Sequence, residues 1–148
     1  MFDVQNPRYQ ELIEEKLKRN HFSKHLGFSL TSVKPGVVEG RLRMQEFLAQ
    51  QNGFAHGGVL MSLCDITAGF AAFTLVKEGE HVVTAEIKVS CLRPANGEVL
   101  VSKGWVIKPG RNIYFCESEV WSVAGGEKTL AAKSSSSMAV VREGGYRK

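Results

Sequence analysis

A long apolar segment, Gly57 to Val76, constrains the fold more than any other part of the sequence. Apolar side chains fall on every side of a helix drawn through it, which predicts a buried helix rather than a surface helix. The segment carries one charged side chain, Asp65, at its centre, and so does not suit a helix that spans a bilayer. The rest of the chain must therefore wrap around this helix.

The segments on both sides of the helix alternate polar and apolar residues with the period of β-strands. Two strands joined by a turn at Lys34–Gly36 are expected over residues 28–44. Four more strands are expected within residues 81–95, 97–110, 111–126 and 128–141. This order predicts an α+β fold, in which one curved antiparallel sheet of five or six strands wraps around the helix.

The serine run at residues 134–137 could be taken for a linker. We interpret it as strand, because the alternation continues on both sides and small residues suit a sheet face pressed against a helix. The edges of such a sheet would be exposed, which favours sheet-to-sheet pairing between subunits.

The length of 148 residues suits one domain with one core. Residues 7–25 predict a helix with Pro7 in its first turn. We therefore divide the chain into an N-terminal helical extension over residues 1–25, one domain over residues 26–142 and a tail over residues 143–148.

The net charge of +4 and the pI near 9.1 come from scattered basic residues, a pattern that does not indicate nucleic-acid binding. A small anionic ligand with phosphates would suit this charge equally well. The first ten residues are polar and resemble neither a signal nor a transit peptide. Because Cys64, Cys91 and Cys116 form no CxxC pair, we expect a cytoplasmic protein with free thiols and no membrane partner.

One set of residues in and around the apolar segment resembles the signature of the hotdog-fold acyl-CoA thioesterases, and more narrowly the phenylacetate-degradation (PaaI-type) branch. These residues are Asn52, Gly53, His56, Gly57, Gly58, Leu63, Asp65, Gly69 and Ala71. The resemblance covers about residues 26 to 141. It implies a hotdog fold, assembled as dimers and usually as dimers of dimers, that hydrolyses an acyl-CoA thioester without a metal or redox cofactor.

The resemblance also implies roles for individual residues. Asp65 would be the general base or nucleophile, and the Gly57 N–H would form the oxyanion hole. Asn52 would hold the thioester or the attacking water, and Thr84 would help to position water near the carboxylate. The candidates for binding the phosphates of CoA are Arg93, Lys108 and Arg111.

The helix geometry supports an active site shared between two chains. A helix N-terminus offers unpaired N–H groups, and the side-chain-free Gly57 and Gly58 would let a carbonyl oxygen approach them. Gly57 and Asp65 are eight residues apart, which is about 12 Å along one helix. A reacting carbonyl must lie close to both groups, so we expect Gly57 of one chain to face Asp65 of another. An isolated monomer would then be inactive.

Several residues also have a plainer interpretation. Asp65 could accept hydrogen bonds that fix packing only, although a buried acid without a partner is rare. His56 is a candidate proton carrier, but we favour a role in ordering the loop and orienting the glycine amides. His21 and His25 have a spacing found in metal sites, yet they lack an evident third ligand, so we expect a surface pair and no bound metal.

Two other functions compete with thioester hydrolysis. One is an acyl dehydratase or hydratase with a hotdog fold, which the absence of proline from "GFAHGGVL" disfavours. The other is a non-catalytic acyl-CoA-binding module, which would have no need of Asp65 as a base. The sequence does not decide whether the acyl group is an aryl-acetyl, a hydroxylated aromatic or a medium-chain group. Phe54, Phe70 and Phe73 could line its pocket, although the last two have the spacing of core residues.

Overall fold

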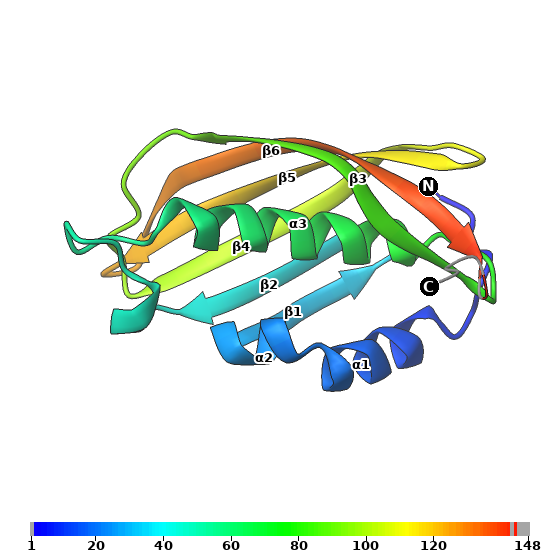
Figure 1. Ribbon diagram of the computed structural model, residues 1–148, viewed down its shortest axis with the longest axis horizontal. Helices are drawn as coiled ribbons and strands as arrows, with labels where there is room; N and C mark the ends of the chain where they lie inside the picture. Colours follow the sequence, from blue (N-terminus) through cyan, green and yellow to red (C-terminus); the bar gives the residue numbers. More distant parts are fainter. Residues whose placement is uncertain (1, 143, 145–148) are drawn as a thin grey trace.

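The computed structural model describes residues 2–142 and 144 and consists of one six-stranded sheet with three α-helices (Figure 1). The predicted tail over residues 143–148 lies outside the described residues except for Gly144. The elements in chain order are α1 (Tyr9–Arg19), α2 (His21–Leu26), β1 (Phe28–Lys34), β2 (Val37–Arg43), the short 3₁₀ helix η1 (Glu46–Leu48), α3 (Gly57–Phe73), β3 (Glu80–Cys91), β4 (Val99–Pro109), β5 (Ile113–Ala124) and β6 (Glu127–Arg142).

The sheet is antiparallel throughout, with the strand order β1-β2-β4-β5-β6-β3. It curves around α3, which lies across one face (Figure 1). The serine run belongs to β6, where Ser135 is aligned with Glu117 of β5 on one side and Lys88 of β3 on the other. The predicted α+β layout and the interpretation of the serines as strand are both confirmed.

The composition of the long helix predicts burial on every side, but in the structure one side of the helix is accessible. Most of its apolar side chains are in the core, including Leu63, Ala68 and Ala71 with no exposed surface. However, Gly58 and Met61 are exposed and Asp65 and Gly69 are half-buried. These four residues follow one another at helical spacing, so they form a single accessible stripe along α3. Asp65 lies in the middle of this stripe, which explains how a carboxylate is accommodated in so apolar a helix.

Gly104 sets the close approach of α3 to the sheet. A Cβ on this β4 residue would overlap the backbone of Thr67 in α3. The overlapping atoms belong to the helix backbone and not to a flexible side chain, so α3 would have to move away from β4.

We therefore expect Gly104→Ala to lower the free energy of unfolding by about 1–3 kcal/mol, as overpacked cores do. Urea unfolding followed by circular dichroism would measure this change. Gly69→Ala is the matched control, because a Cβ at this helical position meets nothing within 4 Å. Equal stability of both variants would show that the contact at Gly104 is not tight.

The N-terminal extension is two helices rather than the single helix predicted over residues 7–25. The chain breaks at Asn20, whose Oδ1 accepts a hydrogen bond of 3.0 Å from the Ser23 N–H and so caps the start of α2. Pro7 lies before α1 rather than in its first turn. The extension still belongs to the main core, since Ile13 of α1 is fully buried beside residues of α3.

β3 is a long edge strand with an open side. It pairs with β6 on one side only, and none of its 12 residues is fully buried. Val83 is 37% exposed. Long, exposed edges of this kind are rarely left unprotected in monomers, so β3 is where a second strand would add to the sheet.

The three cysteines are free. Cys64 and Cys116 are buried, and burial raises the pKa of both thiols, that of Cys116 to about 12. Cys91 is exposed at the end of β3. Among the described residues, no helix has the length and apolar character required to cross a membrane.

Candidate active site

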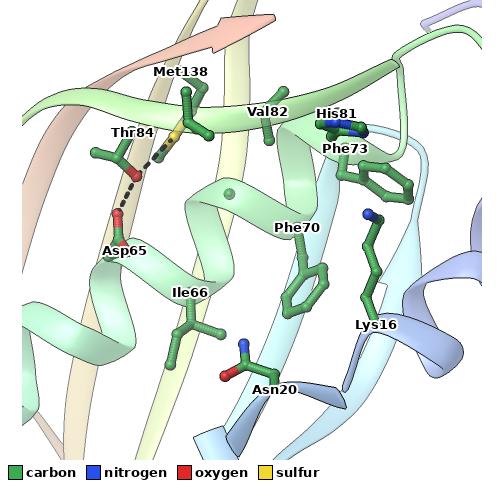
Figure 2. Close-up of a pocket in the computed structure, with 12 residues that line it drawn as sticks. Lys16, Asn20, Asp65, Ile66, Phe70, Phe73, His81, Val82, Thr84 and Met138 are labelled. Atoms are coloured by element: carbon green, nitrogen blue, oxygen red, sulfur yellow. Dashed lines mark hydrogen bonds between the residues drawn. The ribbon is translucent and has the colours of Figure 1, made fainter. Parts of the chain in front are cut away.

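Asp65 is held by a residue from the edge strand. The hydroxyl of Thr84 in β3 donates a hydrogen bond of 2.5 Å to Asp65 Oδ1, and Met138 Sδ lies 3.5 Å from the same hydroxyl (Figure 2). The structure thus brings together the two residues that the sequence predicts to cooperate. The pair faces solvent in the single chain.

Thr84→Val should preserve the shape of this residue while removing its hydroxyl. For the thioester hydrolysis that the resemblance implies, we expect kcat to fall about tenfold, which corresponds to the loss of one hydrogen bond to a charged group, because the carboxylate is then free to rotate. Thr84→Ser should keep most of the activity. Rates of thiol release from an acyl-CoA would compare the variants, and an unchanged kcat in Thr84→Val would show that this bond has no positioning role.

A pocket of about 270 Å³ opens beside the carboxylate. Its apolar wall is formed by Ile66, Phe70 and Phe73 of α3 and by Val82 of β3 (Figure 2). Phe70 and Phe73 also pack in the core. These two side chains therefore line the pocket and belong to the core at the same time. Phe54 lines a separate pocket at the other end of α3.

The N-terminus of α3 forms that second pocket. His56 is the N-cap residue, and its Nδ1 accepts a hydrogen bond of 3.0 Å from the Gly58 N–H. The bond supports the interpretation that His56 orders the loop and the glycine amides. None of the hydrogen bonds among residues 2–142 and 144 is donated by the Gly57 N–H. This amide is therefore available to an incoming oxygen.

Gln50 and Gln51, and not Asn52, line the pocket at this amide. Asn52 is exposed on a turn, and of the two glutamines Gln51 is exposed whereas Gln50 is half-buried. Gln50 Oε1 also accepts a hydrogen bond from the Asn52 N–H. Sequence reasoning missed Gln50, because "QQNG" offers three amide side chains in a row and only the path of the loop distinguishes them.

The two pockets do not meet within one chain. The residues that line the Asp65 pocket and the Gly57 pocket have no member in common. Both groups lie on the same helix, separated by about 12 Å along its axis. Within one chain, the Asp65 carboxylate and the Gly57 N–H therefore cannot contact the same small group.

The three candidates for phosphate binding are divided between the ends of the molecule. Arg93 lines the Gly57 pocket, where its guanidinium donates a hydrogen bond of 3.2 Å to the Leu130 carbonyl. Lys108 is near the far end of β4, and Arg111 lies in the following turn, beside Glu80 at the start of β3. Within one chain these cations do not form a single patch.

His21 and His25 lie on the short α2. The His25 ring stacks at a tilt against Phe47, with centroids 5.4 Å apart. The described residues contain no group of three His, Cys, Asp or Glu side chains placed to hold a metal ion.

A curved antiparallel sheet wrapped around one long helix defines the hotdog class of folds, and in this chain the helix also carries a carboxylate and a free N-terminal amide. The family profile of the Thioesterase superfamily matches residues 52–129. A thioesterase family protein from Silicibacter pomeroyi has a solved structure with a TM-score of 0.89 and 30% sequence identity, covering 90% of this chain and 98% of that one. The chain therefore belongs to the thioesterase superfamily.

Two other similar proteins agree with this assignment. Human acyl-coenzyme A thioesterase 13 is 27% identical over 120 residues, which are 80% of this chain and 85% of that protein. The PaaI protein of the E. coli phenylacetic acid degradation operon has the same fold, with a TM-score of 0.81 at 17% identity over 94% of this chain and 96% of that one. The predictions of a hotdog fold and of a thioester hydrolase are confirmed at the level of the family.

Proposed function

We propose that the protein is an acyl-CoA thioesterase whose active sites are each built by two subunits. The observation that carries this proposal is the Asp65 carboxylate, which Thr84 orients at the mouth of an apolar pocket. Asp65 of one subunit acts as general base or nucleophile. The Gly57 N–H of the other binds the carbonyl oxygen.

In the general-base form, the carboxylate of Asp65 removes a proton from water as the water oxygen attacks the thioester carbon. The carbonyl oxygen becomes negatively charged and is stabilised by the Gly57 N–H at the positive end of α3. Collapse of the tetrahedral intermediate breaks the C–S bond. CoA leaves as a thiolate that is then protonated, and the free acid remains.

The open edge of β3 supplies the interface. An antiparallel copy of β3 paired about the C-terminal half of the strand would place its Cys91 end near Thr84. Gly57 lies next to Cys91, since a Cβ on Gly57 would be 4.0 Å from Cys91 Sγ. The pairing that places Cys91 near Thr84 would therefore bring Gly57 there as well. Such pairing would bring the oxyanion site of one chain toward Asp65 of the other, and would cover the carboxylate that a single chain leaves exposed.

The same pairing suggests roles for the remaining polar residues. Gln50, which lines the Gly57 pocket, would replace Asn52 as the amide that holds the thioester or the water. Arg93 would meet the phosphates of CoA from the subunit that provides Gly57. Lys108 and Arg111 would reach the nucleotide only from the other subunit. We further propose that dimers associate into tetramers and that the enzyme works in the cytoplasm, where its thiols stay reduced.

The test measures three signals with the wild-type protein. Thiol release from phenylacetyl-CoA, 4-hydroxyphenylacetyl-CoA and octanoyl-CoA reports hydrolysis. Calorimetry with the same esters reports binding, and loss of absorbance of an enoyl-CoA reports hydration. Thiol release from any ester supports the proposal and indicates the acyl class. Binding without thiol release would identify a binding module, and enoyl consumption without thiol release would identify a hydratase.

A further inference from the structure

The N-terminal extension reaches the far end of the Asp65 pocket. Lys16 of α1 and Asn20, between α1 and α2, line this pocket together with residues of α3 and β3. Figure 2 shows both side chains rising from below α3, with their nitrogen atoms turned toward Phe70 and Phe73. The pocket thus has a carboxylate at one end and the Lys16 nitrogen at the other, with the Asn20 amide below Ile66 and Phe70 between them.

Asn20 presents a donor to this pocket. Its Oδ1 is occupied, because it accepts the N–H of Ser23 to cap α2. The Nδ2 group is left facing the cavity, and no acceptor among the described residues takes its hydrogen bonds. An amide nitrogen donates and cannot accept. This position therefore favours an acceptor on the ligand.

Lys16 adds a positive charge. Its Nζ lies 4.8 Å from the centroid of the Phe73 ring, and the ion pairs among the described residues do not include it. Glu15, Glu78 and Glu80 line the adjoining groove on the other side of Lys16, and His81 of β3 lines both cavities. Lys16 is half-buried, so a charge brought close to it is less screened than at an open surface.

The distance between the two ends fits an extended acyl group. Asp65 and Phe73 are eight residues apart on α3, which is about 12 Å. Ile66, Phe70 and Val82 make the wall between them apolar. A group bound along this wall would be apolar in its middle, would pass the Asn20 amide and would end beside Lys16.

We propose that the extension selects acyl-CoA esters whose acyl group carries a carboxylate at the end remote from the thioester. This inference rests on the proposed thioesterase function and names its substrate class. The thioester carbon lies at Asp65, the chain follows the apolar wall past Asn20 Nδ2, and the terminal carboxylate accepts a hydrogen bond from Lys16 Nζ. Lys16 and Asn20 determine specificity and take no part in the reaction itself.

The experiment compares two esters that differ only at the remote end, octanoyl-CoA and the mono-CoA ester of octanedioic acid. The ratio of their kcat/KM values should favour the dicarboxylic ester in the wild type. Lys16→Met keeps the length of the side chain without its charge and should reduce this ratio about tenfold, as loss of a hydrogen bond between charged groups does, chiefly by lowering kcat/KM for the dicarboxylic ester. Asn20→Asp retains an oxygen to cap α2 and should also reduce the ratio.

Lys18→Met is the matched control, because Lys18 is exposed on the same helix and does not line the pocket; it should leave the ratio unchanged. Hydrolysis of both esters with no preference, or a preference that Lys16→Met leaves intact, would overturn the substrate class while the thioesterase function stands. Hydrolysis of neither ester, nor of any other acyl-CoA, would overturn the proposed function itself and this inference with it.

Discussion

Asp65→Asn should lower kcat/KM for the best acyl-CoA substrate by about 10²–10⁴-fold, the range that a general base contributes. Asparagine has the same shape as aspartate and keeps an oxygen that can accept the hydrogen bond from Thr84. It can neither take a proton from water nor attack the thioester carbon. The loss should therefore appear in kcat, with little change in the affinity for CoA esters. Thiol release and calorimetry measure the two quantities separately.

Circular dichroism and gel filtration should show a wild-type fold and assembly for Asp65→Asn. A folded variant that retains most of its activity would rule out Asp65 as the reacting group. A single turnover in ¹⁸O-labelled water would then test for an anhydride in the wild type. Label in the side chain of Asp65 would identify an anhydride that water opens at the Asp65 carboxyl carbon, whereas label in the product acid alone fits a general base and an anhydride opened at the acyl carbon equally.

A mixed dimer of Asp65→Asn and Gly57→Pro chains should recover about half of the wild-type activity, because in a two-fold assembly with shared sites one of its two sites is intact. Gly57→Pro removes only the N–H of the oxyanion site. Proline is well tolerated at the first position of a helix, and the preceding His56 has φ −60° and ψ 141°, which suits a residue before proline. Each variant alone should be nearly inactive, since loss of one oxyanion donor costs about 10²–10³-fold.

The arrangement of the two substitutions provides the control for this experiment. Chains with two different tags are co-expressed and the mixed dimers are purified through both tags. In the control dimer, both substitutions lie in one chain and the other chain is wild type. Each shared site then contains one substituted residue, so activity should be nearly absent. Sites contained within one chain would give the opposite pattern, with activity in this second dimer and none in the first.

The sequence predicts the elements of this fold well, because most of them depend on local periodicity. The apolar run from Gly57 predicts α3, and alternating residues predict six strands, including the serines of β6. The position of Asp65 in that run also predicts a functional carboxylate. Thr84 is predicted as its neighbour only through the resemblance to a family, since 19 residues separate the two in the chain.

Tertiary structure alone decides how these elements expose their surfaces. The stripe that leaves Asp65 accessible exists because the sheet covers α3 on one side only, a fact that the composition of the helix cannot reveal. The choice between Gln50 and Asn52 depends on the path of the loop before α3. Likewise, the hydrophobic face of the N-terminal segment predicts a helix, but not the break at Asn20 that turns an amide into the pocket of Asp65.

The chain by itself therefore determined the helix and the strands, since these follow from spacing between near neighbours, whereas the residues proposed for thioester hydrolysis came from the resemblance to a family. The edge position of β3 and the meeting of Lys16 with Phe73 came only from the folded structure. The first depends on which strand the sheet leaves unpaired, and the second joins segments that are far apart in sequence. Local periodicity carries no information about such pairings, because they are set by the packing of the whole core.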